Sequence, residues 1–250
     1  MNDPYSLIIV FFTFLLGGIV KGAVGLGMAT VTLAILAVAL DLQTAMALLL
    51  IPTFATNVWQ ALIGGKFLEL LRRIWPFLMM AGGFVWLGGQ ALVSVNLSLL
   101  SALLGCILVF YAIVSLFGFK IVLEPPSETR VGLLIGSING ILTGMTGSLI
   151  FPGIMYLQAL GLTKDLLVQA MGMLFTVSTA ALAVILGSNK LLSMDLGLIS
   201  LAGLVPAIIG MVIGQSIRNL LSEQQFRRIF FVALLVLGAY IIFGAARELS

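Results

Sequence analysis

The chain has 250 residues, of which 61% are hydrophobic and only 8% are charged, and its formal net charge is +3. Soluble domains carry about 25% charged residues, so this composition excludes a soluble protein. The small positive charge fits basic loops at a membrane surface and does not indicate a nucleic-acid partner. The mean hydropathy of +1.24 and several long uncharged runs instead predict an all-α, polytopic integral membrane protein, because about 20 apolar residues cross a bilayer as a helix.

The first apolar segment, residues 7–40, is interrupted by Lys21 and by the glycines Gly22, Gly25 and Gly27. A helix from residue 7 to Lys21 would reach only about 22 Å, which is short of the hydrocarbon thickness. Glycines permit a broken helix with exposed amides. We therefore expect two short helices joined by the glycines, a hairpin.

Lys21 is the unusual residue of this segment, since an ionised lysine deep in a bilayer costs several kcal/mol unless it reaches water or a partner. One reading is structural: the side chain extends to the headgroups or pairs with Asp41. The other is functional: the cation faces a watery cavity and binds an anionic substrate. The sequence leaves both open.

Three ordinary spanning helices follow, and the first contains the stretch IPTFATN, residues 51–57. Pro52 is expected to free a backbone carbonyl one turn earlier and to kink the helix. Thr53 and Asn57 could then line a cavity beside the kink. Alternatively, hydroxyl groups in membrane helices bond their own backbone.

The chain also repeats itself weakly, because Lys21-Gly22 corresponds to Asn139-Gly140 and residues 42–46 correspond to 167–171. This order predicts an internal duplication. The expected parts are a first transmembrane repeat at 1–119, a cytoplasmic linker at 120–130 and a second repeat at 131–250. Each repeat would hold one broken-helix hairpin and three spanning helices.

The second hairpin is expected within residues 131–162. Gly147 breaks the four-residue glycine spacing typical of helix packing, so it is predicted to lie in the loop. Thr146 and Ser148 are plausible caps of the helix that follows, and Pro152 fits its first turn. If the two hairpins meet from opposite faces, their helix N-termini and Lys21 would form a cradle for an anion.

The distribution of basic residues supports hairpins over single tilted helices. With hairpins, the N-terminus lies outside the cell, and only Lys190 and Arg247 lie outside with it. The two repeats are then inverted in the inner (plasma) membrane, an arrangement typical of secondary transporters. The cytoplasmic cations are Lys66, Arg72, Arg73, Lys120, Arg130, Lys164, Arg218, Arg227 and Arg228.

The motifs GGIVKGAVGLG (17–27) and GSINGILTGMTGSLIFP (136–152) resemble the two glycine-rich signatures of the sulfite exporter TauE/SafE family. This resemblance covers essentially the whole chain and implies transport of sulfur oxyanions or organosulfonates. One departure is that Thr32 or Leu33 stands where the family's first motif often closes with a proline. The positions that match the motifs are Lys21, Gly22, Gly25, Gly27, Asn139, Gly140, Gly144 and Gly147.

Taken together, these patterns predict a secondary transporter, most simply an exporter, of small sulfur-containing anions such as sulfite, thiosulfate, sulfoacetate or other organosulfonates. Alternating access is the expected mechanism. We expect no enzyme, catalytic residue, cofactor or metal; the partners are a small anion and the lipid bilayer, and a homodimer is left open. An anion channel, a carrier for carboxylates or another solute, and a membrane scaffold are the alternatives. The predicted substrate-binding residues are Lys21, Gly22, Gly25, Gly27, Thr53, Asn57, Asn139, Gly140, Thr143, Gly144, Thr146, Gly147 and Ser148.

Overall fold

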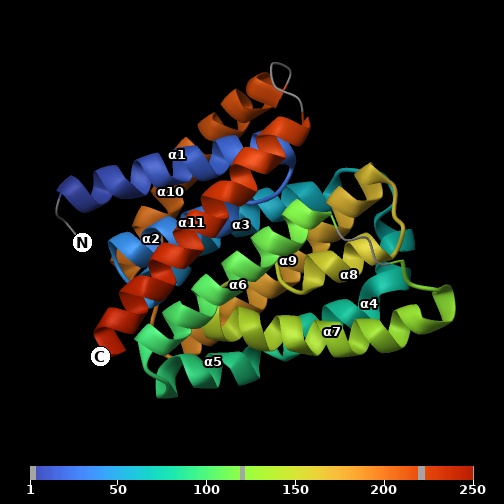
Figure 1. Cartoon of the computed structure of the whole chain (residues 1–250), viewed down its shortest axis with the longest axis horizontal. Coiled ribbons are helices and arrows are strands. Elements are labelled where there is room, and N and C mark those ends of the chain that lie inside the picture. The colour runs from blue at the N-terminus through green and yellow to red at the C-terminus, as the bar shows by residue number, and fades with distance from the viewer. Residues whose placement is uncertain (1–3, 119–121, 219–222, 250) are drawn as a thin grey trace. The chain divides into compact units, whose positions relative to one another are not determined.

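The computed structural model describes residues 4–118, 122–218 and 223–249 (Figure 1). Within that part of the chain there are eleven helices and no strand, so the predicted all-α fold is confirmed. The helices are α1 (Pro4–Val24), α2 (Met28–Ala39), α3 (Leu42–Leu62), α4 (Phe67–Gly83), α5 (Val85–Ser94), α6 (Leu97–Phe117), α7 (Pro125–Thr146), α8 (Gly153–Ala159), α9 (Lys164–Ser188), α10 (Met194–Arg218) and α11 (Glu223–Leu249).

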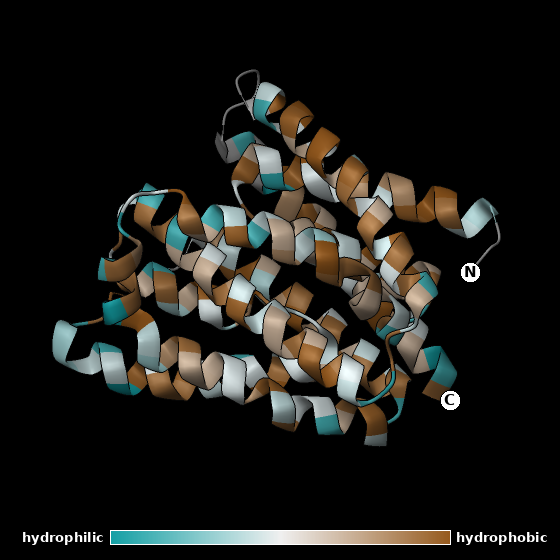
Figure 2. Cartoon of the chain, turned by 180° about the vertical axis from the view of Figure 1, so that it is seen from behind, coloured by the Kyte–Doolittle hydropathy of each residue, from teal (hydrophilic) through white to brown (hydrophobic). Residues whose placement is uncertain are grey.

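Seven helical stretches of the described residues are long and apolar enough to cross a membrane. One is α1, and the other six follow the two predicted hairpins, three after each: α3, α4 with α5, and α6, then α9, α10 and α11. Figure 2 shows hydrophobic residues along most of their length and hydrophilic residues gathered near helix ends and connections. The chain is therefore a multi-pass membrane protein, as its composition predicts.

The chain divides into two compact units, and each draws helices from both predicted repeats. Unit 1 comprises residues 1–52, 95–118 and 190–250, and unit 2 comprises residues 53–94 and 119–189. The division into repeats at 120–130 is a statement about the sequence and stays a prediction. Within the predicted linker, residues 120 and 121 lie outside the described residues, and α7 already begins at Pro125.

In unit 1, α1 packs along α10, and α6 packs along α11 (Figure 1). Four glycines bring the backbones of α1 and α10 together. A Cβ at Gly18 or Gly22 would overlap the carbonyl of Ala207 or Met211, and one at Gly210 or Gly214 would overlap a carbonyl of α1. Glycines four residues apart thus form the smooth contact face that their spacing predicts.

In unit 2, α7 packs against α4 and α5 in the same manner. A Cβ at Gly136 would lie 2.6 Å from the Phe77 carbonyl oxygen, and one at Gly140 would lie 2.6 Å from the Ala81 carbonyl oxygen. One turn further, a Cβ at Gly144 would overlap the carbonyl of Val85. In both units, therefore, the first helix of a hairpin packs through glycines on the second spanning helix of the other predicted repeat.

Candidate functional site

The first hairpin breaks at the glycines that the sequence singles out. α1 ends at Val24 and α2 begins at Met28, and between them Gly25 has φ +84° and Gly27 has φ +97°. L side chains rarely adopt such angles, so a glycine is required at both positions. The predicted interruption is confirmed. The predicted short first arm is wrong, however, because the 21 residues of α1 extend about 31 Å.

Lys21 lies in the last turn of α1, one turn before the break, and only 6% of its surface is exposed. Its carbonyl accepts a hydrogen bond from the Gly25 amide at 2.7 Å. The side chain is thus buried inside the protein, and both readings of Lys21, structural and functional, stay predictions. Asp41 has a local role as well: its carboxylate accepts a hydrogen bond from the Thr44 amide at the start of α3, at 2.9 Å. A cation near the C-terminal end of a helix is favoured by the helix dipole.

Two threonines of α2 add polar groups on the other side of this break. Thr30 is 4% exposed and Thr32 is fully buried, and neither hydroxyl has a hydrogen-bond partner among the described residues. A Cβ at Gly17 of α1 would lie 2.5 Å from the Thr32 hydroxyl, so α1 and α2 are in close contact there. Unit 1 therefore holds a buried ammonium and two buried hydroxyl groups close to the interruption in the sequence.

The second hairpin breaks after Thr146, where Gly147 caps α7 with φ +73°. The loop is held by hydroxyl groups of α7: Thr143 donates to the Ser148 carbonyl at 2.9 Å, and Thr146 accepts from the Ser148 amide at 3.2 Å. Thr146 also donates to Leu142 at 2.7 Å. The hydroxyl protons of Thr143 and Thr146 are therefore used inside the chain.

The cap of α8 comes from a residue that the sequence did not suggest for this purpose. The side-chain oxygen of Asn139 accepts a hydrogen bond from the amide of Gly153, the first residue of α8, at 2.9 Å. The predicted caps, Thr146 and Ser148, do not reach that helix end, because the loop to Pro152 separates them from it. The capping prediction is thus wrong.

Several donors of unit 2 are left over after these bonds, among them the hydroxyls of Ser178 and Thr179 on α9 and three groups of predicted site residues. The Nδ2 group of Asn139 and the hydroxyls of Ser148 and Thr53 are buried without a hydrogen-bond partner in the described part of the chain. Asn139 is fully buried, Ser148 is 3% exposed and Thr53 is 1% exposed. A buried donor without a partner costs about 1–3 kcal/mol, so these groups are the ones that a ligand or water would satisfy. Asn57, a further predicted site residue of α3, is 2% exposed.

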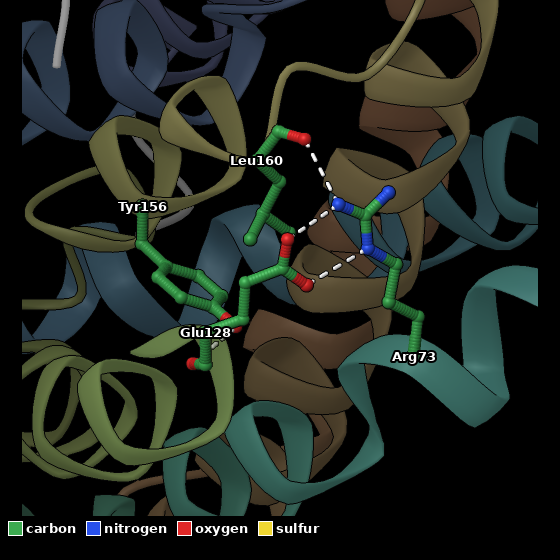
Figure 3. Close-up of polar contacts among 4 residues, drawn as sticks. All are labelled: Arg73, Glu128, Tyr156 and Leu160. Carbon is green, nitrogen blue, oxygen red and sulfur yellow. Dashed lines mark hydrogen bonds and ion pairs between the residues drawn. The ribbon is translucent and has the colours of Figure 1, made fainter. Parts of the chain in front are cut away.

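The two ends of the second hairpin meet. The Leu123 amide, just before α7, donates to the Ala159 carbonyl at the end of α8, at 2.9 Å. Nearby, Arg73 of α4 makes a bidentate ion pair with Glu128, with Nη2–Oε1 at 2.6 Å and Nε–Oε2 at 3.0 Å (Figure 3). The segment 123–160 therefore returns to the level at which it starts, as the hairpin prediction requires.

Figure 3 shows that the same arginine also holds the end of α8. Nη2 of Arg73 donates to the Leu160 carbonyl at 3.0 Å, and the Tyr156 hydroxyl donates to the Glu128 carbonyl at 3.1 Å. Tyr156 also packs on Phe77 of α4, with ring centroids 4.6 Å apart. We call Arg73, Glu128, Tyr156 and Leu160 the arginine clamp. It joins α4, α7 and α8 within unit 2.

A family model of the sulfite exporter TauE/SafE family matches residues 10–241, a range that includes both interrupted hairpins. The chain belongs to the TauE/SafE family. No curated protein and no solved structure matched the chain. This family is one of membrane transporters. In the described residues of the chain, no three His, Cys, Asp or Glu side chains gather into a group that could hold a metal ion.

Three of the predicted site glycines of this TauE/SafE protein have a packing role. Gly22, Gly140 and Gly144 each face a carbonyl of a neighbouring helix, so helix contact accounts for their missing side chain. Their role as ligands stays a prediction. The glycines of the breaks, Gly25 and Gly147, differ because their positive φ sets the turn of the chain.

One residue of the polar interior was missed from the sequence. Ser200 of α10 is 1% exposed, and its hydroxyl donates to the Leu48 carbonyl of α3 at 2.6 Å. That carbonyl is the one that Pro52 frees, since proline has no N–H to donate to the residue four positions earlier. A lone serine in an apolar run is the only signal in the sequence, and it does not name its partner.

Proposed function

We propose that the protein is a secondary transporter that exports small sulfur-containing anions, such as sulfite, thiosulfate, sulfoacetate or other organosulfonates, by alternating access. Family membership supports the transporter class and the sulfur anion. The observation that carries the proposal for this chain is the burial of Lys21 in an apolar helix. An ionisable residue inside a membrane segment is expensive to keep and typically marks an ion or substrate pathway.

The proposal assigns a different contribution to each unit, taken by itself. In unit 1, Lys21 supplies a positive charge that compensates the desolvation of the substrate. In unit 2, Asn139, Ser148 and Thr53 supply uncharged donors that oxyanion oxygens accept. A sulfonate or sulfite group has several oxygens that accept hydrogen bonds. A site made of hydrogen-bond donors therefore suits it well.

Export of an anion does not have to be coupled to protons, so it requires no buried carboxylate to carry them. A membrane potential that is negative inside drives an anion outward with about 2.3 kcal/mol per charge for each 100 mV. The acidic residues of the chain all lie near the ends of apolar segments in the sequence. Efflux driven by the anion's own gradient and by the potential is therefore the simplest mechanism.

The test is flux through purified protein in liposomes loaded with one anion at a time. We expect sulfite, thiosulfate or sulfoacetate to leave the liposomes, and a carboxylate of matched size to stay. External substrate should accelerate release of internal labelled substrate, because a carrier exchanges and a channel does not. Selective carboxylate flux would assign a different substrate, and flux without exchange would assign a channel. The absence of flux for every anion would leave the scaffold alternative.

A further inference from the structure

Among the helices of the described residues, α3 is the one within which the chain passes from one compact unit to the other. The boundaries between the units fall at 52/53, 94/95, 118/119 and 189/190. The last three lie at helix ends or in connections, after α5, after α6 and after α9. The first lies between Pro52 and Thr53, in the middle of a helix of 21 residues. α3 is therefore shared: its first half belongs to unit 1 and its second half to unit 2.

The residue at this boundary weakens the helix. Pro52 cannot donate to the carbonyl of Leu48, and its ring crowds that carbonyl. Proline is also the commonest cause of a sharp helix kink. In a membrane protein, a freed carbonyl has no bulk water to bond, so a neighbouring helix must supply a donor.

Ser200 supplies this donor and also an acceptor. Its hydroxyl donates to the Leu48 carbonyl at 2.6 Å and accepts from the Ile51 amide at 3.2 Å. The side chain of Ser200 on α10 thus binds two backbone groups of α3 in the turn before Pro52, the Leu48 carbonyl and the Ile51 amide. α10 and residues 42–52 belong to the same unit, so this contact fixes the upstream half of α3 and stops at the proline.

From this arrangement we propose that Pro52 is a hinge at which α3 bends during transport, and that Ser200 is the positioning residue that holds its upstream half. The inference rests on the proposed function, because alternating access requires one part of the protein to move against another. Thr53, one of the buried donors, directly follows the hinge. Bending at Pro52 would therefore move this donor while Leu48 and Ile51 stay in place.

The pairing of hinge and serine makes a specific double-substitution test possible. Pro52→Ala restores an N–H that can donate to the Leu48 carbonyl, so the hydroxyl of Ser200 becomes dispensable. The proteins to compare are the unaltered chain, Pro52→Ala, Ser200→Ala, Ser200→Thr and the double variant Pro52→Ala/Ser200→Ala. Matched controls are Pro206→Ala, which removes an interior proline of α10, and Ser216→Ala, which removes an exposed serine that bonds its own helix.

Two measurements on the purified full chain separate the outcomes. For flux of thiosulfate from liposomes, Pro52→Ala should lower the maximal rate about tenfold with little change in KM, because a hinge limits turnover and not binding. Pro206→Ala should keep the normal rate. For thermal unfolding, Ser200→Ala should lower the Tm when residue 52 is proline and should have much less effect in the Pro52→Ala background. Ser200→Thr should restore the unaltered Tm.

The inference would be overturned by normal turnover of Pro52→Ala, or by effects of the two substitutions on Tm that simply add. It would also be overturned if Ser216→Ala lowered the Tm as much as Ser200→Ala. An unaltered protein that moves no anion would instead overturn the proposed function, and the hinge with it. The failure of the hinge alone is recognised by normal transport in the unaltered protein and in Pro52→Ala.

Discussion

The side-chain oxygen of Asn139 on α7 accepts a hydrogen bond from the backbone amide of Gly153, the residue with which α8 begins. The two groups are 2.9 Å apart and buried. This bond occupies the side-chain oxygen of Asn139 and so fixes the orientation of the side-chain amide. The Nδ2 group is then directed away from Gly153. A residue that caps a helix inside the hairpin thus also keeps a buried donor without a partner among the described residues, and the proposed function assigns this donor to the substrate.

Gly153→Ala should disturb this contact and destabilise the protein. A Cβ at residue 153 would lie 2.6 Å from Oδ1 of Asn139 and 2.7 Å from Cδ2 of Leu174. Overpacking of this kind costs about 1–3 kcal/mol, so the Tm of the purified protein should fall. The control is Gly197→Ala on α10, where an added Cβ meets nothing within 4 Å. Equal melting of the two variants would contradict the tight fit at Gly153.

Gly22→Ala is expected to weaken the contact between α1 and α10. Its Cβ would overlap the Met211 carbonyl, which belongs to a helix backbone and cannot rotate away. We expect a loss of about 1–3 kcal/mol in unfolding free energy, measured by thermal or denaturant unfolding in detergent. Gly83→Ala serves as the control because open space surrounds the position. If Gly22→Ala melted like Gly83→Ala, packing would not explain this glycine.

The local breaks of this fold are predictable from the sequence, because the positive φ that a glycine allows depends on that residue alone and on no tertiary partner. Gly25 and Gly147 illustrate this, as both leave the four-residue packing spacing and both lie in loops. The bonds of Asn139 and Ser200 are not predictable in the same way. Each joins groups that meet only through tertiary packing, and the Ser200–Leu48 pair is separated by 152 positions. The length of α1 was also missed, since Gly22 was read as part of the break although it serves contact with α10.

Arg73→Lys should loosen the arginine clamp although the charge is kept. A lysine cannot form the two parallel bonds to Glu128 or reach Leu160 at the same time. Because the Arg73 side chain is 41% exposed, we expect a loss of only about 1 kcal/mol. The Tm measures it, and Arg72→Lys, at an exposed neighbouring position, is the matched control. If Arg73→Lys and Arg72→Lys had the same Tm, the bidentate ion pair would have no net effect on stability.

The predicted inverted topology can be tested by labelling with a membrane-impermeant thiol reagent. In a Cys106→Ala background, single cysteines at Arg72 and Arg228 should both react from the cytoplasmic side, and one at Lys190 should react from outside. Residues 72, 190 and 228 are exposed, so accessibility of the side chain does not bias the comparison. Reaction of positions 72 and 228 from opposite sides would contradict the inverted arrangement.

Lys21→Gln should abolish most anion flux while the protein stays folded. Glutamine keeps a polar side chain of similar length but removes the charge that compensates an anion in a low-dielectric site. Loss of one such interaction of about 2–3 kcal/mol corresponds to a fall of roughly 30- to 150-fold in binding or flux. Lys190→Gln, a charge removal in a connection outside the helices, is the matched control and should transport normally. Since removal of a buried charge also removes its desolvation cost, the Tm of Lys21→Gln should not fall. Normal flux through a folded Lys21→Gln protein would remove the lysine from the substrate path and leave its burial to be explained by structure alone.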